Sequence, residues 1–370
     1  MEILNINDNS GKLYYVGGVV RDEILGVKSL DTDLIYEGNA IEFAKEKNFD
    51  IIQVNEPFGT VRINLNGKLV DIASTRHEIY PKPGHLPVVS DIGCPLSEDV
   101  KRRDFTINSL YKSVKTGEII DFTGGIDDIK NKKLRILHDK SFIEDPTRIL
   151  RMLKFRMRFG FCPYDSTFNF QMEYLRNINQ DVSYKRIKKE FEELFGYIGG
   201  SVLSKTEAFK ILVNEGIYKL LCKFSPELSK INFNEELLKK SSSWIIWGGL
   251  LPDISYLPLT KKENKILNDL AILKNNSSLS DEFCCYKTFS KMFDETIILY
   301  AMLYNKSIAL NYLNNLKNIK LLINGQDLIE LGLEPSKNFN EIFDLVLKEK
   351  LKNPSLSKQD EINIMKNLLG

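Results

Sequence analysis

The alternation of apolar and polar residues predicts two kinds of structure along this 370-residue chain. Between residues 12 and 72, short apolar stretches of period two alternate with short segments of helical period, which indicates strands and helices in turn. Asn66-Gly67 separates two of the predicted strands and favours a tight hairpin turn. Because a hairpin pairs its strands antiparallel, we expect an α/β unit with a mixed sheet.

The rest of the chain is predicted to be helical. From residue 141 onward, apolar residues recur at i, i+3 and i+4, first over residues 141–161 and then over 183–198. After residue 200 we expect short to medium helices joined by segments rich in Asn, Lys and Ser. Residues 77–99 contain four prolines and two glycines, so we expect an irregular loop there. A loop of this length in a compact domain is often functional.

Composition narrows the class of protein. With 43% hydrophobic and 27% charged residues, the chain has the composition of an ordinary globular protein. No stretch reaches the ~20 apolar residues that a membrane span needs, and no signal sequence opens the chain. The five cysteines form no recognisable disulfide framework. We therefore expect a cytoplasmic protein that does not contact a membrane.

Charge and histidine content limit the ligands. Lys and Arg together number 51 against 50 Asp and Glu, so a nucleic-acid surface would have to be a local basic patch. Residues 130–158 form such a patch, with ten basic residues against three acidic ones. The three histidines give no zinc-binding spacing, so the ligands of any metal would be carboxylates. Carboxylate ligands favour Mg²⁺ or Mn²⁺.

The stretch "LDTDLIYEG" (30–38) places Asp31 and Asp33 at the start of an apolar run. Side chains two residues apart on a strand point to the same face, with Cα atoms roughly 7 Å apart. Like charges held that close favour a bound divalent cation. Upstream, Gly17 and Gly18 separate a strand from a helix, where backbone N–H groups can approach a phosphate. Singly, these features fit a common turn, a solvated strand end or a glycosyltransferase D-x-D motif, but together they indicate a nucleotide site.

Three later stretches carry further candidates. "KRRDFTINSL" (101–110) fits a charged helix start capped by Asp104. In "EDPTRILR" (144–151), Asp145-Pro146 predicts a helix that starts with Asp145 at the N-cap and Pro146 at the first position. Asp145, Arg148 and Arg151 would then lie on one helix face, where a carboxylate beside a guanidinium can read the edges of C and A and reject G and U. "SYKRIKKEFEELF" (183–195) fits a surface helix with many ion pairs.

Taken in order, "GGVVRDEILG", "DTDL", "RRDFTIN" and "EDPTR" resemble the motifs of the class II tRNA nucleotidyltransferases, the CCA-adding enzymes and their poly(A) polymerase relatives. The resemblance covers roughly residues 12–200. It implies an α+β fold, with a polymerase-β-like catalytic head of mixed sheet at 1–138 and a helical neck with a nucleobase-templating motif at 139–200. A helical body and tail at 201–370 would bind tRNA, with Lys306, Lys317 and Lys320 among the candidate contacts.

The resemblance also implies a role for each motif residue. Asp31 and Asp33 would be catalytic and would bind Mg²⁺, with Asp71 on a later strand as a further carboxylate ligand. Residues that would bind or surround the nucleotide are Gly17, Gly18, Arg21, Asp22, Arg102, Arg103, Asp104, Asn108, Asp145, Arg148 and Arg151. Glu144, Arg186 and Glu190 would support them.

The implied activity is addition of C, C and then A to the 3′ end of tRNA from CTP and ATP. The RNA 3′-hydroxyl would attack the nucleotide α-phosphate, and pyrophosphate would leave. Related CCA-adding enzymes need a flexible element to switch from C to A, and residues 77–99 have the place and length for it. Addition of CC only, of A only or of A tails stays open, as does a non-catalytic RNA-binding protein on the same fold. The sequence indicates no protein partner.

Overall fold

The computed structural model describes residues 6, 10–29, 32–178, 181–197, 199–274, 279, 281–304, 306–334 and 338–369. Asp31 lies outside the described residues. The chain divides into two compact units, Met1–Ser225 with Tyr256–Pro258, and Pro226–Ser255 with Leu259–Gly370. The predicted boundaries at residues 138 and 200 both fall within the first unit and stay predictions.

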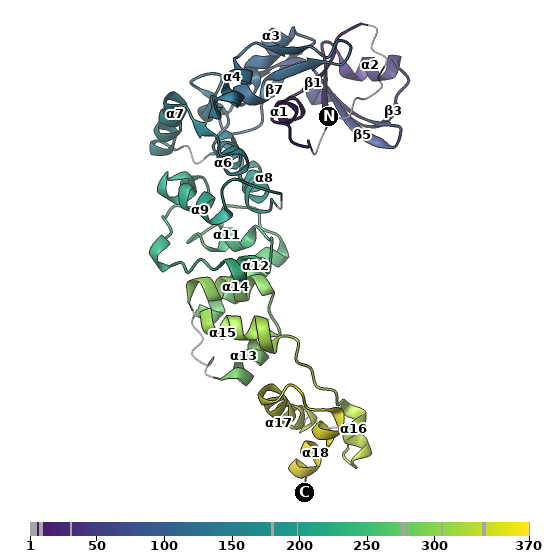
Figure 1. Ribbon diagram of the computed structural model, residues 1–370, viewed down its shortest axis with the longest axis vertical. Helices are drawn as coiled ribbons and strands as arrows, with labels where there is room; N and C mark the ends of the chain where they lie inside the picture. The colour runs from purple at the N-terminus through teal and green to yellow at the C-terminus, as the bar shows by residue number, and fades with distance from the viewer. Residues whose placement is uncertain are drawn as a thin grey trace. The chain divides into compact units, whose positions relative to one another are not determined.

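A seven-stranded sheet forms the first part of the first unit (Figure 1). Its strand order is β3-β4-β5-β2-β1-β8-β9, and only the β2–β5 pair is parallel. The strands are β1 (Leu13–Val16), β2 (Asp33–Tyr36), β3 (Asp50–Asn55), β4 (Thr60–Leu65), β5 (Lys68–Ser74), β8 (Leu110–Ser113) and β9 (Ile119–Asp121). The helices inserted along this part are α1 (Gly18–Ile24), α2 (Ala40–Glu46), α3 (Leu96–Asp99) and α4 (Gly125–Lys130).

Local sequence explains the mixed pairing. Asn66 and Gly67 both have positive φ, at 53° and 83°, which matches the twist of the β4–β5 hairpin. On one face of the sheet, Val61, Ile63 and Ile72 are buried and α2 packs on β4 and β5. The predicted mixed sheet is confirmed.

The prediction of an irregular loop at residues 77–99 is wrong. β6 (Arg76–Ile79) pairs antiparallel with β7 (Val88–Ile92), and α3 follows. The prolines and the glycine at 81–87 occupy the tip of this hairpin rather than its strands, so they did not prevent pairing.

Helices complete the first unit: α5 (Ser141–Glu144), α6 (Thr147–Phe159), α7 (Asp165–Arg176), α8 (Tyr184–Phe195) and α9 (Lys205–Asn214). A short parallel pair, β10 (Lys133–Leu134) with β11 (Cys162–Pro163), accompanies them. Helix α6 begins at Thr147 with Pro146 at the N-cap, one residue later than predicted. Asp145 therefore precedes the helix that carries Arg148 and Arg151, although its Oδ1 accepts a hydrogen bond from Thr147 N at 3.1 Å.

In its described residues the second unit is helical. Its helices are α10 (Glu235–Leu238), α11 (Ile245–Gly249), α12 (Lys261–Lys274), α13 (Glu282–Phe289), α14 (Asp294–Leu303), α15 (Lys306–Asn311), α16 (Gly325–Glu330), α17 (Asn338–Lys352) and α18 (Lys358–Leu369). The predicted succession of a mixed-sheet head and a helical remainder is confirmed. Within the described residues, no helix has the length and apolar character needed to cross a membrane.

Candidate active site

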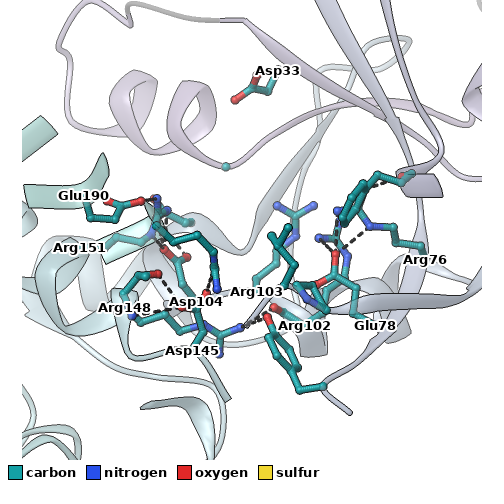
Figure 2. A pocket seen from close by; sticks show the side chains of 18 of the residues that line it. Asp33, Arg76, Glu78, Arg102, Arg103, Asp104, Asp145, Arg148, Arg151 and Glu190 are labelled. Carbon is teal, nitrogen blue, oxygen red and sulfur yellow. Dashed lines mark hydrogen bonds and ion pairs between the residues drawn. The ribbon is translucent and has the colours of Figure 1, made fainter. Parts of the chain in front are cut away.

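A cavity of about 420 Å³ in the first unit gathers most of the predicted site residues (Figure 2). Its walls come from the β1–α1 turn, the β6–β7 hairpin, the segment after α3, and helices α6 and α8. The predicted residues that line it are Gly17, Gly18, Asp33, Arg102, Arg103, Asp104, Asn108, Asp145, Arg148, Arg151, Arg186 and Glu190. In Figure 2, Asp33 lies at one end of the cavity and Asp145 and Arg148 lie at the other.

Asp99 organises the two arginines of the "RRD" motif. Its fully buried carboxylate accepts from Arg102 Nε at 2.9 Å on one oxygen and from Arg103 Nη2 at 2.9 Å on the other. Burial would raise the pKa of Asp99, but the charges of Arg103 and Arg102 outweigh burial and lower it. The Tyr111 hydroxyl also donates to Asp99, at 2.9 Å. Asp99 therefore fixes two cationic side chains in the wall of the cavity.

Asp104 and Arg151 join the segment after α3 to helix α6. Arg151 donates to Asp104 Oδ2 through Nε at 2.8 Å and lies 2.6 Å from it through Nη2. Burial alone would raise the pKa of Asp104, but the charge and hydrogen bonds of Arg151 lower it to about 2. Glu190 on α8 lies 3.4 Å from Arg151 and 3.1 Å from Lys154, so the helix predicted as a charged surface faces α6 instead.

Asp145 and Arg148 are both buried, and each is held by other partners rather than by the other. The Oδ2 atom of Asp145 accepts from Arg186 on α8. Arg148 donates to Ser141 Oγ at 2.7 Å, to the Arg102 carbonyl at 3.0 Å and to the Tyr80 hydroxyl at 3.4 Å. A carboxylate acceptor and a guanidinium donor are thereby fixed side by side in the cavity wall.

Arg21 and Asp22 lie behind the cavity rather than in its lining. The Arg21 guanidinium donates to Asp22 Oδ1 at 2.9 and 2.6 Å and to Asn108 Oδ1 at 2.5 Å. Burial lowers the pKa of Arg21. Gly17, with φ at 71°, precedes α1, and its N–H donates to the Leu110 carbonyl at 3.1 Å. Arg21 and Asp22 therefore support the glycine turn and Asn108 from the interior of the protein.

The tip of the β6–β7 hairpin is fastened to the end of α5 and the start of α8. Gly84 N donates to the Glu144 carbonyl at 2.9 Å, and Ser183 N donates to the Gly84 carbonyl at 3.0 Å. Arg186 donates to the His85 carbonyl at 3.1 Å. Glu144 thus contributes a backbone group here, and it does not line the cavity.

The tip also carries an ion-pair cluster. Asp181 lies 2.9 Å from Lys82 and 3.1 Å from His85. These pairs are largely exposed and add little beside the backbone bonds. Tyr80, Leu86 and Pro87 of the hairpin line the cavity, so the fastened tip forms one of its walls.

The carboxylates at the other end suit a hard cation. Asp33 and Asp71 are direct partners across the parallel strands β2 and β5, so their side chains lie on the same face of the sheet. Asp71 accepts two hydrogen bonds from Arg62, both at 2.7 Å. No three His, Cys, Asp or Glu side chains cluster as a metal site within the described residues, which exclude Asp31. Asp33, with Asp71 beside it, offers oxygen donors that fit Mg²⁺.

Sequence reasoning missed several residues of the site. Asp99 stands three and four positions before Arg102 and Arg103, a helical spacing that could have indicated the ion pairs. Glu78 and Tyr80 lie in the segment 77–99 that was predicted as an irregular loop, and Arg76 directly precedes it, so no pattern placed these residues in the cavity.

Comparison with known proteins defines the class. Residues 13–135 match the family model "Poly A polymerase head domain". Over 97% of its length the chain is 30% identical to the A-adding tRNA nucleotidyltransferase of Halalkalibacterium halodurans, 89% of which it covers. It is 28% identical to the CCA-adding enzyme of Lactococcus lactis, with 96% of this chain and 93% of that enzyme covered.

A solved structure agrees with these relatives. The apo form II of a CCA-adding enzyme superimposes with a TM-score of 0.74 and 25% identity, covering 96% of this chain and 91% of that one. The chain belongs to the tRNA nucleotidyltransferase and poly(A) polymerase family, and it is a tRNA 3′-end nucleotidyltransferase.

Proposed function

We propose that this enzyme adds the terminal adenosine to tRNA that already ends in CC. The observation that carries this choice is the fastening of the β6–β7 hairpin tip to the neck. A single site that takes first C and then A has to change its width, because a purine is longer than a pyrimidine. Here the wall formed by Tyr80, Leu86 and Pro87 is tied at Gly84 and His85. A wall held in one position suits one nucleotide.

The residues of the cavity are assigned to the parts of ATP. Asp145 accepts from the adenine amino group and Arg148 donates to the neighbouring ring nitrogen. Asp104, Asn108, Arg102 and Arg103 surround the ribose and the α-phosphate. Gly17 and Gly18 lie at the triphosphate, where the lack of side chains lets a phosphate come close to the backbone. The spread of these residues along the cavity, from Asp145 at one end to Asp33 at the other, supports this order.

Mg²⁺ held by Asp31 and Asp33 would lower the pKa of the RNA 3′-hydroxyl and neutralise charge on the α-phosphate. Asp71, the partner of Asp33 across β2 and β5, would be a further carboxylate. In the reaction, the RNA 3′-oxygen forms a bond to the α-phosphorus while the bond from that phosphorus to the bridging oxygen of the β-phosphate breaks. The hydroxyl proton passes to a neighbouring carboxylate or water, and pyrophosphate leaves.

Complete CCA addition is the second candidate. Cytosine and adenine offer the same order of amino donor and ring acceptor, so Asp145 and Arg148 alone do not reject CTP. The likeness to CCA-adding enzymes also supports it. The expectation of a flexible switching element at residues 77–99 rested on the place and length of a loop, but this segment contains the β6–β7 hairpin, whose tip is fastened by hydrogen bonds.

Incubation of the purified protein with labelled ATP or CTP and three tRNAs tests the choice. The tRNAs end before, within and after CC. We expect A on tRNA ending in CC and no C on either shorter tRNA. C on the shortest tRNA followed by A would instead establish CCA addition. C without A would establish CC addition, and long A tails on all three would establish a poly(A) polymerase.

Replacement of a carboxylate tests catalysis against simple RNA binding. Asp33→Asn should abolish incorporation, because the change removes the negative charge of a metal ligand. It should leave tRNA binding within about twofold, because asparagine has nearly the shape of aspartate. Asp127→Asn is a matched control, since Asp127 forms an exposed pair with Lys130 outside the cavity. Full incorporation by the Asp33 variant would remove the metal assignment.

A further inference from the structure

Asp145 and Arg148, the pair proposed to read the base, lie in a short corner of the chain between α5 and α6. Asp145 directly follows α5 with extended backbone, at φ −141°, and its N–H donates to the Ser141 carbonyl at 3.1 Å. Thr147 begins α6 two residues later and lines the cavity. Ser141 is fully buried and Thr147 is 3% exposed. The corner therefore holds two buried hydroxyl groups beside the pair.

Thr147 occupies one of the two carboxylate oxygens of Asp145. Its hydroxyl donates to Asp145 Oδ1 at 2.6 Å, and its N–H donates to the same atom at 3.1 Å. A carboxylate oxygen accepts about two hydrogen bonds, so Oδ1 is filled. Oδ2 accepts from Arg186 and has room for one more donor. In the part of the chain that the structure describes, the place left for a base is therefore on Oδ2.

Ser141 holds Arg148 in a comparable way. Arg148 Nη1 donates to Ser141 Oγ at 2.7 Å, and Nη2 donates to the Arg102 carbonyl at 3.0 Å and to the Tyr80 hydroxyl at 3.4 Å. A guanidinium has one N–H on Nε and two on each Nη. Counted over the described residues, Nε and one hydrogen of Nη1 are left for a base. Each member of the pair is thus bonded to a hydroxyl and offers particular atoms to the cavity.

These bonds matter because the same two side chains could also bind the wrong base. Adenine presents an amino donor beside a ring acceptor, whereas guanine presents a carbonyl acceptor beside a ring N–H. A carboxylate only accepts and a guanidinium only donates. If Asp145 and Arg148 were able to shift along the base edge, Arg148 would reach the guanine carbonyl and Asp145 the guanine ring N–H. Rejection of guanine therefore requires that both side chains stay in place.

We propose that Thr147 and Ser141 are positioning residues that set the specificity for the base. The Thr147 hydroxyl fixes the rotation of the Asp145 carboxylate, so that Oδ2 meets the amino group of adenine. Ser141 fixes Arg148 beside the neighbouring ring nitrogen. This inference rests on the proposed base reading by Asp145 and Arg148, and it holds whether A alone or CCA is added. Each hydroxyl acts through its bond to the pair rather than on the nucleotide.

Steady-state kinetics of two Thr147 variants tests the first hydroxyl. Thr147→Val removes it but keeps the shape of the side chain and the backbone N–H. Because a hydrogen bond to a charged group is lost, kcat/KM for ATP should fall about tenfold and the preference for ATP over GTP should narrow by about the same factor. Thr147→Ser keeps the hydroxyl and should stay within about twofold of the wild type in both quantities.

Ser141→Ala tests the second hydroxyl independently of Thr147. It should narrow the preference for ATP over GTP by about threefold, less than Thr147→Val, because Arg148 keeps two other acceptors. Thr167→Val is the matched control. Thr167 on α7 is fully buried, its Oγ1 accepts from Ile136 N at 3.3 Å, and it does not line the cavity. The control should lose stability but keep the nucleotide preference of the wild type.

Dissociation constants for ATP and GTP, measured by calorimetry, give a readout without turnover, and thermal unfolding shows that each variant is folded. A Thr147→Val variant with the preference of Thr167→Val would overturn the inference, as would a Thr147→Ser variant as impaired as Thr147→Val. If Thr147→Val does not fold, Ser141→Ala decides by the same comparison. A wild type without preference for ATP over GTP would instead contradict the proposed base reading itself.

Discussion

Single side chains in the cavity are held by partners far away in the sequence. Asp104 and Arg151 are 47 positions apart, and Asp145 and Arg186 are 41 apart. Breaking such a partly buried pair leaves a charge without compensation, which costs more than the pair itself contributes. These two pairs therefore tie together parts of the site that lie far apart in the sequence.

Arg151→Met should destabilise the protein by about 2 kcal/mol at pH 7, because Asp104 then loses its main cation. In the wild type the lowered pKa of Asp104 contributes stability that is complete above about pH 4. That contribution is lost as the pH falls through the folded-state pKa of about 2.

Urea unfolding between pH 7 and pH 2 measures this effect. The stability of the variant should fall less over the acid range than that of the wild type. Lys130→Ala, which removes an exposed pair with Asp127, should stay within about 0.5 kcal/mol. Parallel acid profiles for wild type and Arg151→Met would contradict the assignment.

Arg148 supplies the donor that the proposed base reading requires. Arg148→Ala should lower kcat/KM for ATP by about 10- to 100-fold, since a hydrogen bond from a charged group is worth roughly 1.5–3 kcal/mol. The preference for ATP over GTP should narrow by a similar factor. Steady-state kinetics with each nucleotide measures both, and an unchanged preference would show that other residues read the base.

Among the elements, the β6–β7 hairpin is the one on which the proposed nucleotide specificity rests. Its tip residue Gly84 has φ at +81°, and a Cβ there would lie 2.7 Å from Val182 Cγ1 and 3.3 Å from the Asp181 carbonyl oxygen. The tip thus fits against the start of α8 only because this residue has no side chain. Three hydrogen bonds then hold it there.

Gly84→Ala should loosen the tip and lower the preference for ATP over CTP by about tenfold. The variant should also lose roughly 1–3 kcal/mol of stability through strain and the close contact. Gly67→Ala is the matched control, since Gly67 also has positive φ but nothing within 4 Å of a Cβ. A Gly84 variant that keeps its nucleotide preference would contradict a role for the fastened tip.

The elements also show how far sequence reasoning reaches. The mixed sheet was predictable because alternation and the Asn66-Gly67 turn are local signals. The β6–β7 hairpin was not, since its prolines obscured strands of four and five residues. The order of the motifs along the sequence was enough to predict most of the residues that line the cavity. The contacts of Arg148 with Tyr80 and with the Arg102 carbonyl could not be predicted, because they depend on long-range packing rather than on spacing in the sequence.

At the scale of the whole molecule, the residues suited to bind the nucleotide lie in the first of the two units. All twelve arginines occur at or before Arg186. Bidentate hydrogen bonding of a guanidinium to a phosphate or a base is therefore confined to the first unit. Of the predicted tRNA contacts in the second unit, Lys317 pairs with Asp294, and the side chain of Lys306 lies outside the described residues.

Glu361 tests the independence of the two units. Its buried carboxylate lies 2.9 Å from Lys350 and accepts from Leu322 N at 2.7 Å and Ile323 N at 3.1 Å. Glu361→Ala should cost about 3–5 kcal/mol in the second unit. ATP binding, measured by calorimetry at 15 °C, should stay within about twofold, and a large loss of ATP affinity would show that the units are coupled.

Mass spectrometry of the tRNA 3′ terminus, after incubation with all four nucleoside triphosphates, tests the central claim most directly. On tRNA ending in CC, the account predicts a terminal fragment heavier by one adenylate residue, with tRNA that lacks CC left unchanged. A terminal fragment that gained cytidylate on the shorter tRNA would contradict it.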